Sequence, residues 1–161
     1  MYEICRATSI KDPGFLQLLS QFLIEAGRPM PDSVALERLE ASVRSDRIRF
    51  YMAIGDGGRV VGVVSLTQTF STMRMAPYGI VADLYVHPGH RGRGAAASLL
   101  LQAMDGAHEA GCCYLISEGA GDMEGLYDRK GWYVADGLMR YEVNLNAAPP
   151  SLTTTGEITF D

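Results

Sequence analysis

Apolar residues recur along the chain at two spacings, and these spacings predict a series of strands and helices. From Asp12 to the break at Gly27, apolar residues return every three or four positions, as they do on one face of a helix. The same spacing and the capping residues around it predict helices at 12–26, 33–43, 95–110 and 122–131. Alternating or short apolar runs bounded by turn residues predict strands at 2–8, 50–54, 60–68, 80–86, 112–117 and 138–145.

The predicted elements follow the order β-α-α-β-β-β-α-β-α-β, which is typical of an α/β sandwich with a mixed sheet. Residues 56–59 form a hairpin turn, and residues 70–77 are predicted as a loop that carries Arg74. Residues 80–86 are mostly apolar, as in a central strand covered on both faces. We expect one domain over residues 1–146. The tail, 147–161, is expected to fray or to pair with a sheet edge or a partner subunit.

Composition and charge narrow the class of protein. The chain has 161 residues, of which 47% are apolar and 20% charged, as expected for one soluble globular domain. No apolar run reaches the ~20 residues of a membrane helix, and the first residues lack a secretory pattern, so we expect a cytoplasmic protein without membrane contact. The net charge of −5 argues against general nucleic-acid binding, because that affinity comes mainly from neutralising phosphates.

The three cysteines and three histidines carry little catalytic signal. Cys112 and Cys113 are adjacent, which fits neither a Cys-x-x-Cys pair nor an even set of disulfides, so we expect buried thiols. His87 and His90 are expected to be solvated rather than to bind a metal, and we expect no metal site.

The most informative segment joins the predicted strand at 80–86 to the helix at 95–110. His87 to Gly94 is rich in Gly and Arg and precedes an Ala-rich helix start. The first amides of a helix lack internal partners, and glycine lets a phosphate approach the backbone, so this loop predicts an anion site. A purely structural glycine turn is the alternative. A dinucleotide fingerprint is disfavoured because five residues separate Val86 from Gly92, and the chain has no Gly-Lys-Ser/Thr of a Walker loop.

This segment resembles the acyl-CoA loop of the GNAT superfamily of N-acetyltransferases. Arg91, Gly94 and Ala96 match its Arg/Gln-x-x-Gly-x-Gly/Ala signature. Residues 126–132 are similar to a second family block, Leu-Tyr-x-Lys-x-Gly-Phe, with Arg129 and Lys130 in place of Lys-x and Trp132 in place of Phe. The resemblance covers about residues 1–145. It implies a three-layer sandwich whose central mixed, mostly antiparallel sheet is splayed between the fourth and fifth strands.

The resemblance also implies a set of site residues and a co-substrate, acetyl-CoA. Tyr127 occupies the position of the general acid that protonates the departing thiolate. Asp83 is the first candidate for the base that deprotonates the amine, Glu118 the second, and a water chain without a dedicated base is the third. The residues implied for acetyl-CoA are Leu84, Tyr85, Val86, Arg91, Gly92, Arg93, Gly94, Ala95 and Ala96. The polar groups available to an acceptor are Glu25, Arg28, Arg74 and Tyr78.

The function expected from these residues is transfer of acetyl from acetyl-CoA to a primary amine of a small molecule by direct attack. A polyamine, an amino-acid-like amine and an aminoglycoside remain open, the last with a possible role in antibiotic resistance. A non-catalytic acyl-CoA sensor and a peptide or protein N-acetyltransferase are the alternatives. We expect a homodimer.

Overall fold

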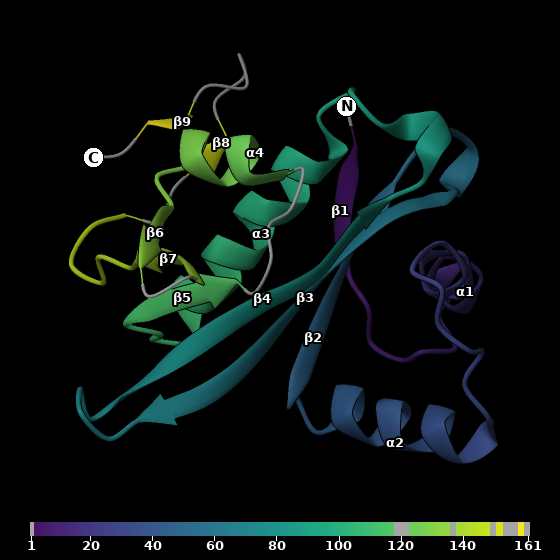
Figure 1. The fold of residues 1–161 in the computed structure, drawn as a ribbon, viewed down its shortest axis with the longest axis horizontal. Helices are drawn as coiled ribbons and strands as arrows, with labels where there is room; N and C mark the ends of the chain where they lie inside the picture. Colours follow the sequence, from purple (N-terminus) through teal and green to yellow (C-terminus); the bar gives the residue numbers. More distant parts are fainter. Residues whose placement is uncertain (1, 118–122, 136–137, 149–150, 153–157, 160–161) are drawn as a thin grey trace. The chain divides into compact units, whose positions relative to one another are not determined.

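The computed structural model describes residues 2–117, 123–135, 138–148, 151–152 and 158–159 (Figure 1). Its α-helices are α1 (Phe15–Glu25), α2 (Ser33–Arg44), α3 (Ala95–Glu109) and α4 (Glu124–Arg129), with 3-10 turns η1 (Asp56–Gly58) and η2 (Pro88–His90). Its strands are β1 (Glu3–Arg6), β2 (Ile48–Ile54), β3 (Val60–Ser71), β4 (Ala76–Val86), β5 (Tyr114–Ser117), β6 (Tyr133–Ala135), β7 (Leu138–Glu142), β8 (Ser151–Leu152) and β9 (Ile158–Thr159).

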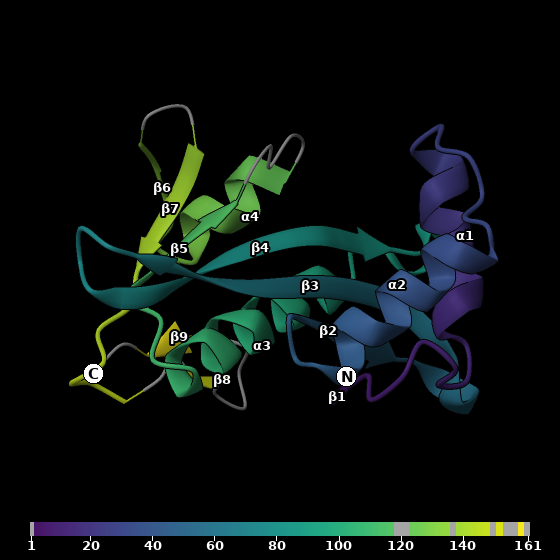
Figure 2. The ribbon, with the colours of Figure 1, turned by 90° about the horizontal axis from the view of Figure 1, so that it is seen from below.

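The main sheet has seven strands in the order β1-β2-β3-β4-β5-β7-β6, and β3 and β4 run beside each other over most of their length (Figure 2). β1 pairs antiparallel with β2, and β7 pairs antiparallel with both β5 and β6. β4 and β5 are parallel, and their register joins Gly79 to Leu115 and Ile80 to Ile116. β4 then continues to Val86. The mixed, mostly antiparallel sheet that the sequence analysis expected is confirmed.

Three parts of the chain differ from the sequence prediction. The predicted loop at 70–77 is largely strand, because β3 extends to Ser71 and β4 begins at Ala76. Pro77 lies in this strand although proline has no backbone N–H to donate, and its carbonyl accepts from the Cys113 N–H. β6 was not predicted, and it has only three residues. In the tail, β8 pairs antiparallel with β9, and the Ala147 carbonyl lies 3.1 Å from His108 Nε2 of α3.

The contacts divide the chain into two compact units, which share β3, β4 and α3. The first comprises residues 1–65 and 83–99. Here α1 and α2 turn apolar faces toward one core, in which the rings of Phe15 and Phe50 meet edge-on with centroids 5.0 Å apart. α2 begins at the cap expected from the sequence, since the Asp32 carboxylate accepts from the Ala35 N–H at 2.8 Å.

The second unit comprises residues 66–82 and 100–161. Its largest fully buried side chain is Trp132, whose ring lies between those of Tyr127 and Tyr141 at centroid distances of 4.9 and 5.8 Å. The backbone N–H of Trp132 donates to the Tyr127 carbonyl, and this bond fixes the end of α4. Across the described segments, no helix is long and apolar enough to cross a membrane.

Candidate functional site

The loop between β4 and α3 presents a row of backbone N–H groups. Within the described part of the chain, the amides of residues 92–97 have no hydrogen-bond partner; the first bond of α3 runs from Ser98 N–H to the Gly94 carbonyl. Gly92 and Gly94 have φ of 74° and 88°, in the left-handed region that favours glycine, and a Cβ at either would meet nothing within 4 Å. Glycine is therefore required there by the backbone conformation. The loop is a ready site for a phosphate or pyrophosphate.

The side chain of Arg91 is anchored to the fold. Its Nε donates to the Val86 carbonyl at 2.9 Å, its Nη2 donates to Glu25 Oε1 at 2.8 Å, and its guanidinium lies 5.5 Å from the Tyr85 ring centroid. These contacts tie the loop to the end of β4 and to the last turn of α1. Arg93, by contrast, is exposed and has no partner among the described residues, so it is the arginine of this loop available to a phosphate.

Glu25 joins the same network through its second oxygen. The Tyr85 hydroxyl donates to Glu25 Oε2 at 2.6 Å. The Tyr85 hydroxyl and the Arg91 guanidinium hold the pKa of the Glu25 carboxyl below its usual value, so it stays charged at neutral pH. Burial, followed by the hydrogen bond to Glu25, raises the pKa of Tyr85 to about 12. Both carboxylate oxygens of Glu25 are thus already engaged at the end of β4.

Asp83 lies where β4 departs from regular alternation. Its φ is 53°, one of three positive values at non-glycine residues in the described chain, and the next buried positions are Tyr85 and Val86, side by side in sequence. An irregular residue of this kind turns the following side chains relative to the sheet. The Asp83 carboxylate is exposed, and its Oδ2 accepts from the hydroxyl of buried Ser65 at 2.8 Å.

In the second unit, Tyr127 is 2% exposed and its hydroxyl is hydrogen-bonded to Ser117 Oγ at 3.3 Å. The contact joins two hydroxyl groups, and either can be the donor. Burial raises the pKa of Tyr127, so the hydroxyl is protonated throughout the neutral range. These properties are those of a general acid.

A glycine-rich amide row beside a helix start and a buried, protonated tyrosine match the expected family, and the comparison with known proteins decides it. Residues 15–132 match the model of the acetyltransferase (GNAT) family. The chain belongs to this family. GNAT proteins are acyl-CoA-dependent N-acetyltransferases, and acetyl-CoA is their acetyl donor.

Individual relatives of this GNAT chain agree with the family match. An uncharacterized N-acetyltransferase of Bacillus subtilis (strain 168), YhfO, is 33% identical over 95 residues, which span 57% of this chain and 64% of that protein. An integron cassette protein from the mobile metagenome of Cole Harbour Salt Marsh is 30% identical, with a TM-score of 0.71 over 91% of each chain. A predicted acetyltransferase of Clostridium acetobutylicum, solved with acetyl-CoA, has 16% identity and a TM-score of 0.70, over 91% of this chain and 97% of that one.

The residues expected to face an acceptor fall into two groups. Glu25 and Arg28 belong to the first unit, and the Arg28 side chain is exposed and without a partner in the described segments. Arg74 and Tyr78 belong to the second unit and meet around one ring: Arg74 lies 4.9 Å from the Tyr114 centroid, and Tyr78 stacks on Tyr114 at 4.6 Å. The Arg74 guanidinium also forms two hydrogen bonds, of 2.8 and 2.9 Å, with the Glu142 carboxylate. Glu118 lies outside the described residues.

Sequence reasoning missed the residues that hold the candidate groups in place. Ser65 and Ser117 each contact a candidate catalytic residue, and both are buried polar residues in strands. A buried serine in a strand needs a hydrogen-bond partner, so its position in an otherwise apolar run was a usable signal. Tyr114 and Glu142 gave no such signal, because a tyrosine and a glutamate in neighbouring strands are unremarkable. Among the described residues, no group of His, Cys, Asp or Glu is arranged to hold a metal ion.

Proposed function

We propose that this chain transfers the acetyl group of acetyl-CoA to a primary amine of a small molecule by direct attack of the amine on the thioester. The observation that carries the proposal is the row of free amides at residues 92–97, held open by two left-handed glycines. Amides in that arrangement suit the pyrophosphate of CoA, since the helix start favours negative charge and no side chain crowds the backbone.

In the proposed reaction, the amine nitrogen forms a bond to the thioester carbon and the carbon–sulfur bond breaks. An alkyl ammonium has a pKa of ~10.4, so it must lose a proton before it attacks at neutral pH. Asp83, exposed and oriented by Ser65, is the candidate that accepts this proton, directly or through water. Tyr127 supplies the proton that the departing CoA thiolate takes up.

The states of Cys5 and Cys112 support direct attack rather than an acetyl-cysteine intermediate at either residue. Cys112 is fully buried, and burial together with Glu3 raises the pKa of Cys5, which disfavours its thiolate. A nucleophilic cysteine requires the opposite shift.

A cationic acceptor fits the carboxylate that remains available, and Arg28, unpaired among the described residues, suits an acceptor that also carries a carboxylate. Glu142 neutralises Arg74, and Arg91 occupies Glu25, whereas the carboxylate of Asp83 is exposed and contacts no cation within the described residues. Polyamines, amino-acid-like amines and aminoglycosides share the primary ammonium that this carboxylate would attract.

The test is a screen of thiol release from acetyl-CoA with polyamines, amino acids, aminoglycosides and short peptides, with CoA binding measured by calorimetry on the same preparation. Release with one class of small amine is the expected result. Release with peptides alone would replace the small-molecule acceptor by a polypeptide. CoA binding without release from any amine would instead support a sensor, and Asp83→Asn should then leave every measured property unchanged.

A further inference from the structure

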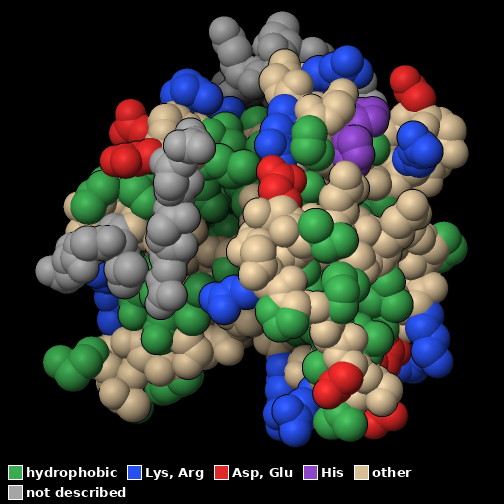
Figure 3. Space-filling model, turned by 45° about the vertical axis from the view of Figure 1, so that its right-hand side comes forward, with side chains coloured by type: hydrophobic (Ala, Val, Ile, Leu, Met, Phe, Trp, Pro, Cys, Tyr) green, Lys and Arg blue, Asp and Glu red, His purple; other side chains and the backbone are tan. Residues whose placement is uncertain are grey.

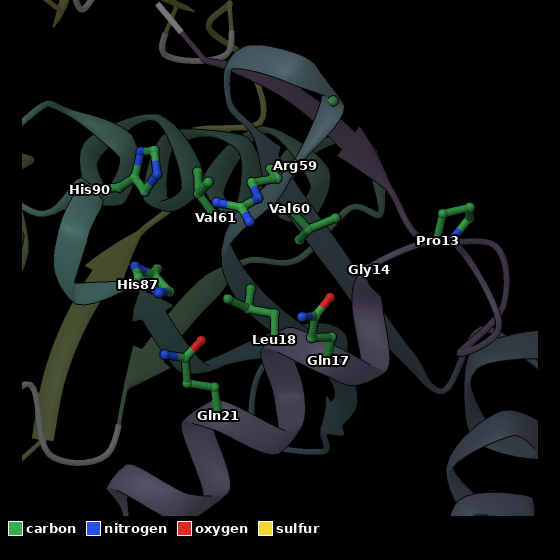
Figure 4. A pocket seen from close by; sticks show the side chains of 11 residues that line it. Pro13, Gly14, Gln17, Leu18, Gln21, Arg59, Val60, Val61, His87 and His90 are labelled. Carbon is green, nitrogen blue, oxygen red and sulfur yellow. The ribbon is translucent and has the colours of Figure 1, made fainter.

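The first unit contains a cavity that residues 92–97 do not line. It has a volume of about 220 Å³ and lies between α1, the start of β3 and η2 (Figure 4). Neither Asp83, Glu25 nor any residue from 91 to 96 lines it. The lining residues used below are Gln17, Leu18, Gln21, Arg59, His87 and His90.

The polar side chains of this cavity include the cation of Arg59 and the carboxamides of Gln17 and Gln21, which donate through nitrogen and accept through oxygen; no acidic residue of the described chain lines it. The guanidinium of Arg59 is turned toward the space between α1 and the histidine rings (Figure 4) and has no partner in the described part of the chain. Gln17 and Gln21 are four residues apart on one face of α1, and their carboxamides also lack partners there. Arg59 therefore gives the cavity a positive charge that no lining carboxylate offsets, which favours an anion.

The two histidines add to this character. The Gly89 N–H donates to His87 Nδ1 at 3.0 Å, so in the neutral ring the proton resides on Nε2, which remains a donor. His90 packs edge-on against His87, with centroids 5.9 Å apart. On one face of the molecule, histidine side chains are flanked on both sides by Lys or Arg side chains (Figure 3).

The apolar part of the lining sets the kind of anion. Leu18 and Val61 are buried, and they form an apolar surface beside the donors. A cavity of ~150 Å³ lined by apolar side chains holds a benzene molecule, so one of 220 Å³ has room for a ligand of about ten non-hydrogen atoms. The guanidinium fork, two carboxamides and an imidazole offer more donors than the two oxygens of a carboxylate accept, which favours a phosphate.

The geometry points to a binding site for a small phosphate monoester, with its phosphate on Arg59 and the glutamines and its carbon body on Leu18 and Val61. The site is separate from the one proposed for acetyl-CoA, and its occupation requires neither acetyl-CoA nor an amine. The phosphate could come from a free metabolite or from the 3′-phosphate of CoA itself. We assign it to a free metabolite, because the β4–α3 loop lines the cavity only through His87 and His90, and none of residues 91–96, the part of that loop assigned to CoA, lines it.

The experiment is a calorimetric titration of the full chain with phenyl phosphate, with phenol and inorganic phosphate as the two partial ligands. A ligand of this size is expected to bind with a Kd on the order of 1 mM, and each partial ligand at least tenfold more weakly. Arg59→Gln should weaken phenyl phosphate at least tenfold, since it removes a charge-assisted contact. Arg38→Gln, an exposed arginine on α2, is the matched control and should change nothing. No heat with phenyl phosphate, or equal binding by Arg59→Gln, would overturn the proposal.

Two further readouts locate the ligand and identify its source. The chain has three histidines, so phenyl phosphate should shift the proton NMR signals of two rings and leave that of His108 unchanged. Signals that shift equally, or not at all, would place the ligand elsewhere. CoA and phenyl phosphate should bind together, and Arg59→Gln should not change the ratio of CoA to dephospho-CoA affinity. Competition between CoA and phenyl phosphate would assign the cavity to the cofactor and refute a separate site. The same conclusion would follow if Arg59→Gln bound CoA and dephospho-CoA with equal affinity while the parent chain preferred CoA.

Discussion

Replacing Tyr127 with phenylalanine tests the proposed chemistry most directly, because the change removes one hydroxyl from a closely packed position. The ring of Tyr127 packs against Trp132, and that contact survives in phenylalanine. The hydroxyl is hydrogen-bonded to Ser117 and, in the proposed reaction, protonates the thiolate. Tyr127→Phe therefore separates the packing of the ring from the chemistry of its proton.

Two effects of different size are expected. Ser117 is buried, so losing its hydrogen-bond partner should lower the free energy of unfolding by about 1–3 kcal/mol. Loss of a general acid should lower kcat by about 10²–10⁴-fold, while CoA affinity stays within about twofold of the parent, because the ring remains in place. Thiol release from acetyl-CoA with the best amine gives kcat, calorimetry gives the CoA affinity, and urea titration gives the stability.

Ser117→Ala is the matched control. It breaks the same hydrogen bond and should cost a similar amount of stability, but it leaves the phenolic proton in place, so kcat should stay within a few-fold of the parent. A kcat of Tyr127→Phe close to that of the parent would remove Tyr127 from the mechanism. An equal loss of kcat in both variants would show that the hydrogen bond, and not the acid, supports turnover.

Three further outcomes are expected. Glu25→Gln should raise the KM for acetyl-CoA several-fold with little change in kcat, because Glu25 holds the arginine of the CoA loop; Glu37→Gln, at an exposed position on α2, should change neither constant. Gly94→Ala should cost about 1 kcal/mol of stability and also weaken CoA binding, whereas Gly27→Ala, at φ 69°, should cost similar stability and leave CoA binding intact. The pKa of Tyr85 is raised to about 12 in the folded chain, so the neutral phenol contributes stability that is complete below pH 10 and falls between pH 10 and 12. Denaturation at several pH values measures this fall. A free energy of unfolding that does not change with pH in that window would contradict the prediction.

The glycine loop could be predicted from sequence because its requirements are local. Glycine is the residue that adopts a left-handed backbone most readily, so its presence in a loop predicts that conformation, and φ is positive at both Gly92 and Gly94. Free amides at a helix start follow from helix geometry alone. The order of the elements was predictable for the same reason, since spacing and capping are read over a few neighbouring residues.

The side chains of the site were harder to predict, because their partners are distant in sequence. Arg91 and Glu25 are 66 residues apart, and Arg74 and Glu142 are 68 apart. The sequence analysis assigned Glu25 and Arg74 to the acceptor and Arg91 to acetyl-CoA, and it identified none of these ion pairs. Only the fold shows that each cation has an anion beside it, so the charge left for a substrate is smaller than the sequence suggests.

Asp83 illustrates how a single backbone angle decides a functional assignment. In a regular strand, Ala82 and Asp83 point to opposite faces, and the resemblance implies that several relatives carry their acid at the position of Ala82. The left-handed conformation at Asp83 breaks this alternation, and aspartate is among the few non-glycine residues that adopt it readily. Aspartate thus both tolerates the left-handed backbone at this position and supplies the carboxylate that the proposed deprotonation of the amine needs. We propose that the irregular strand re-aims the Asp83 carboxylate, which Ser65 contacts, so that an acid one position later in sequence still serves as the base.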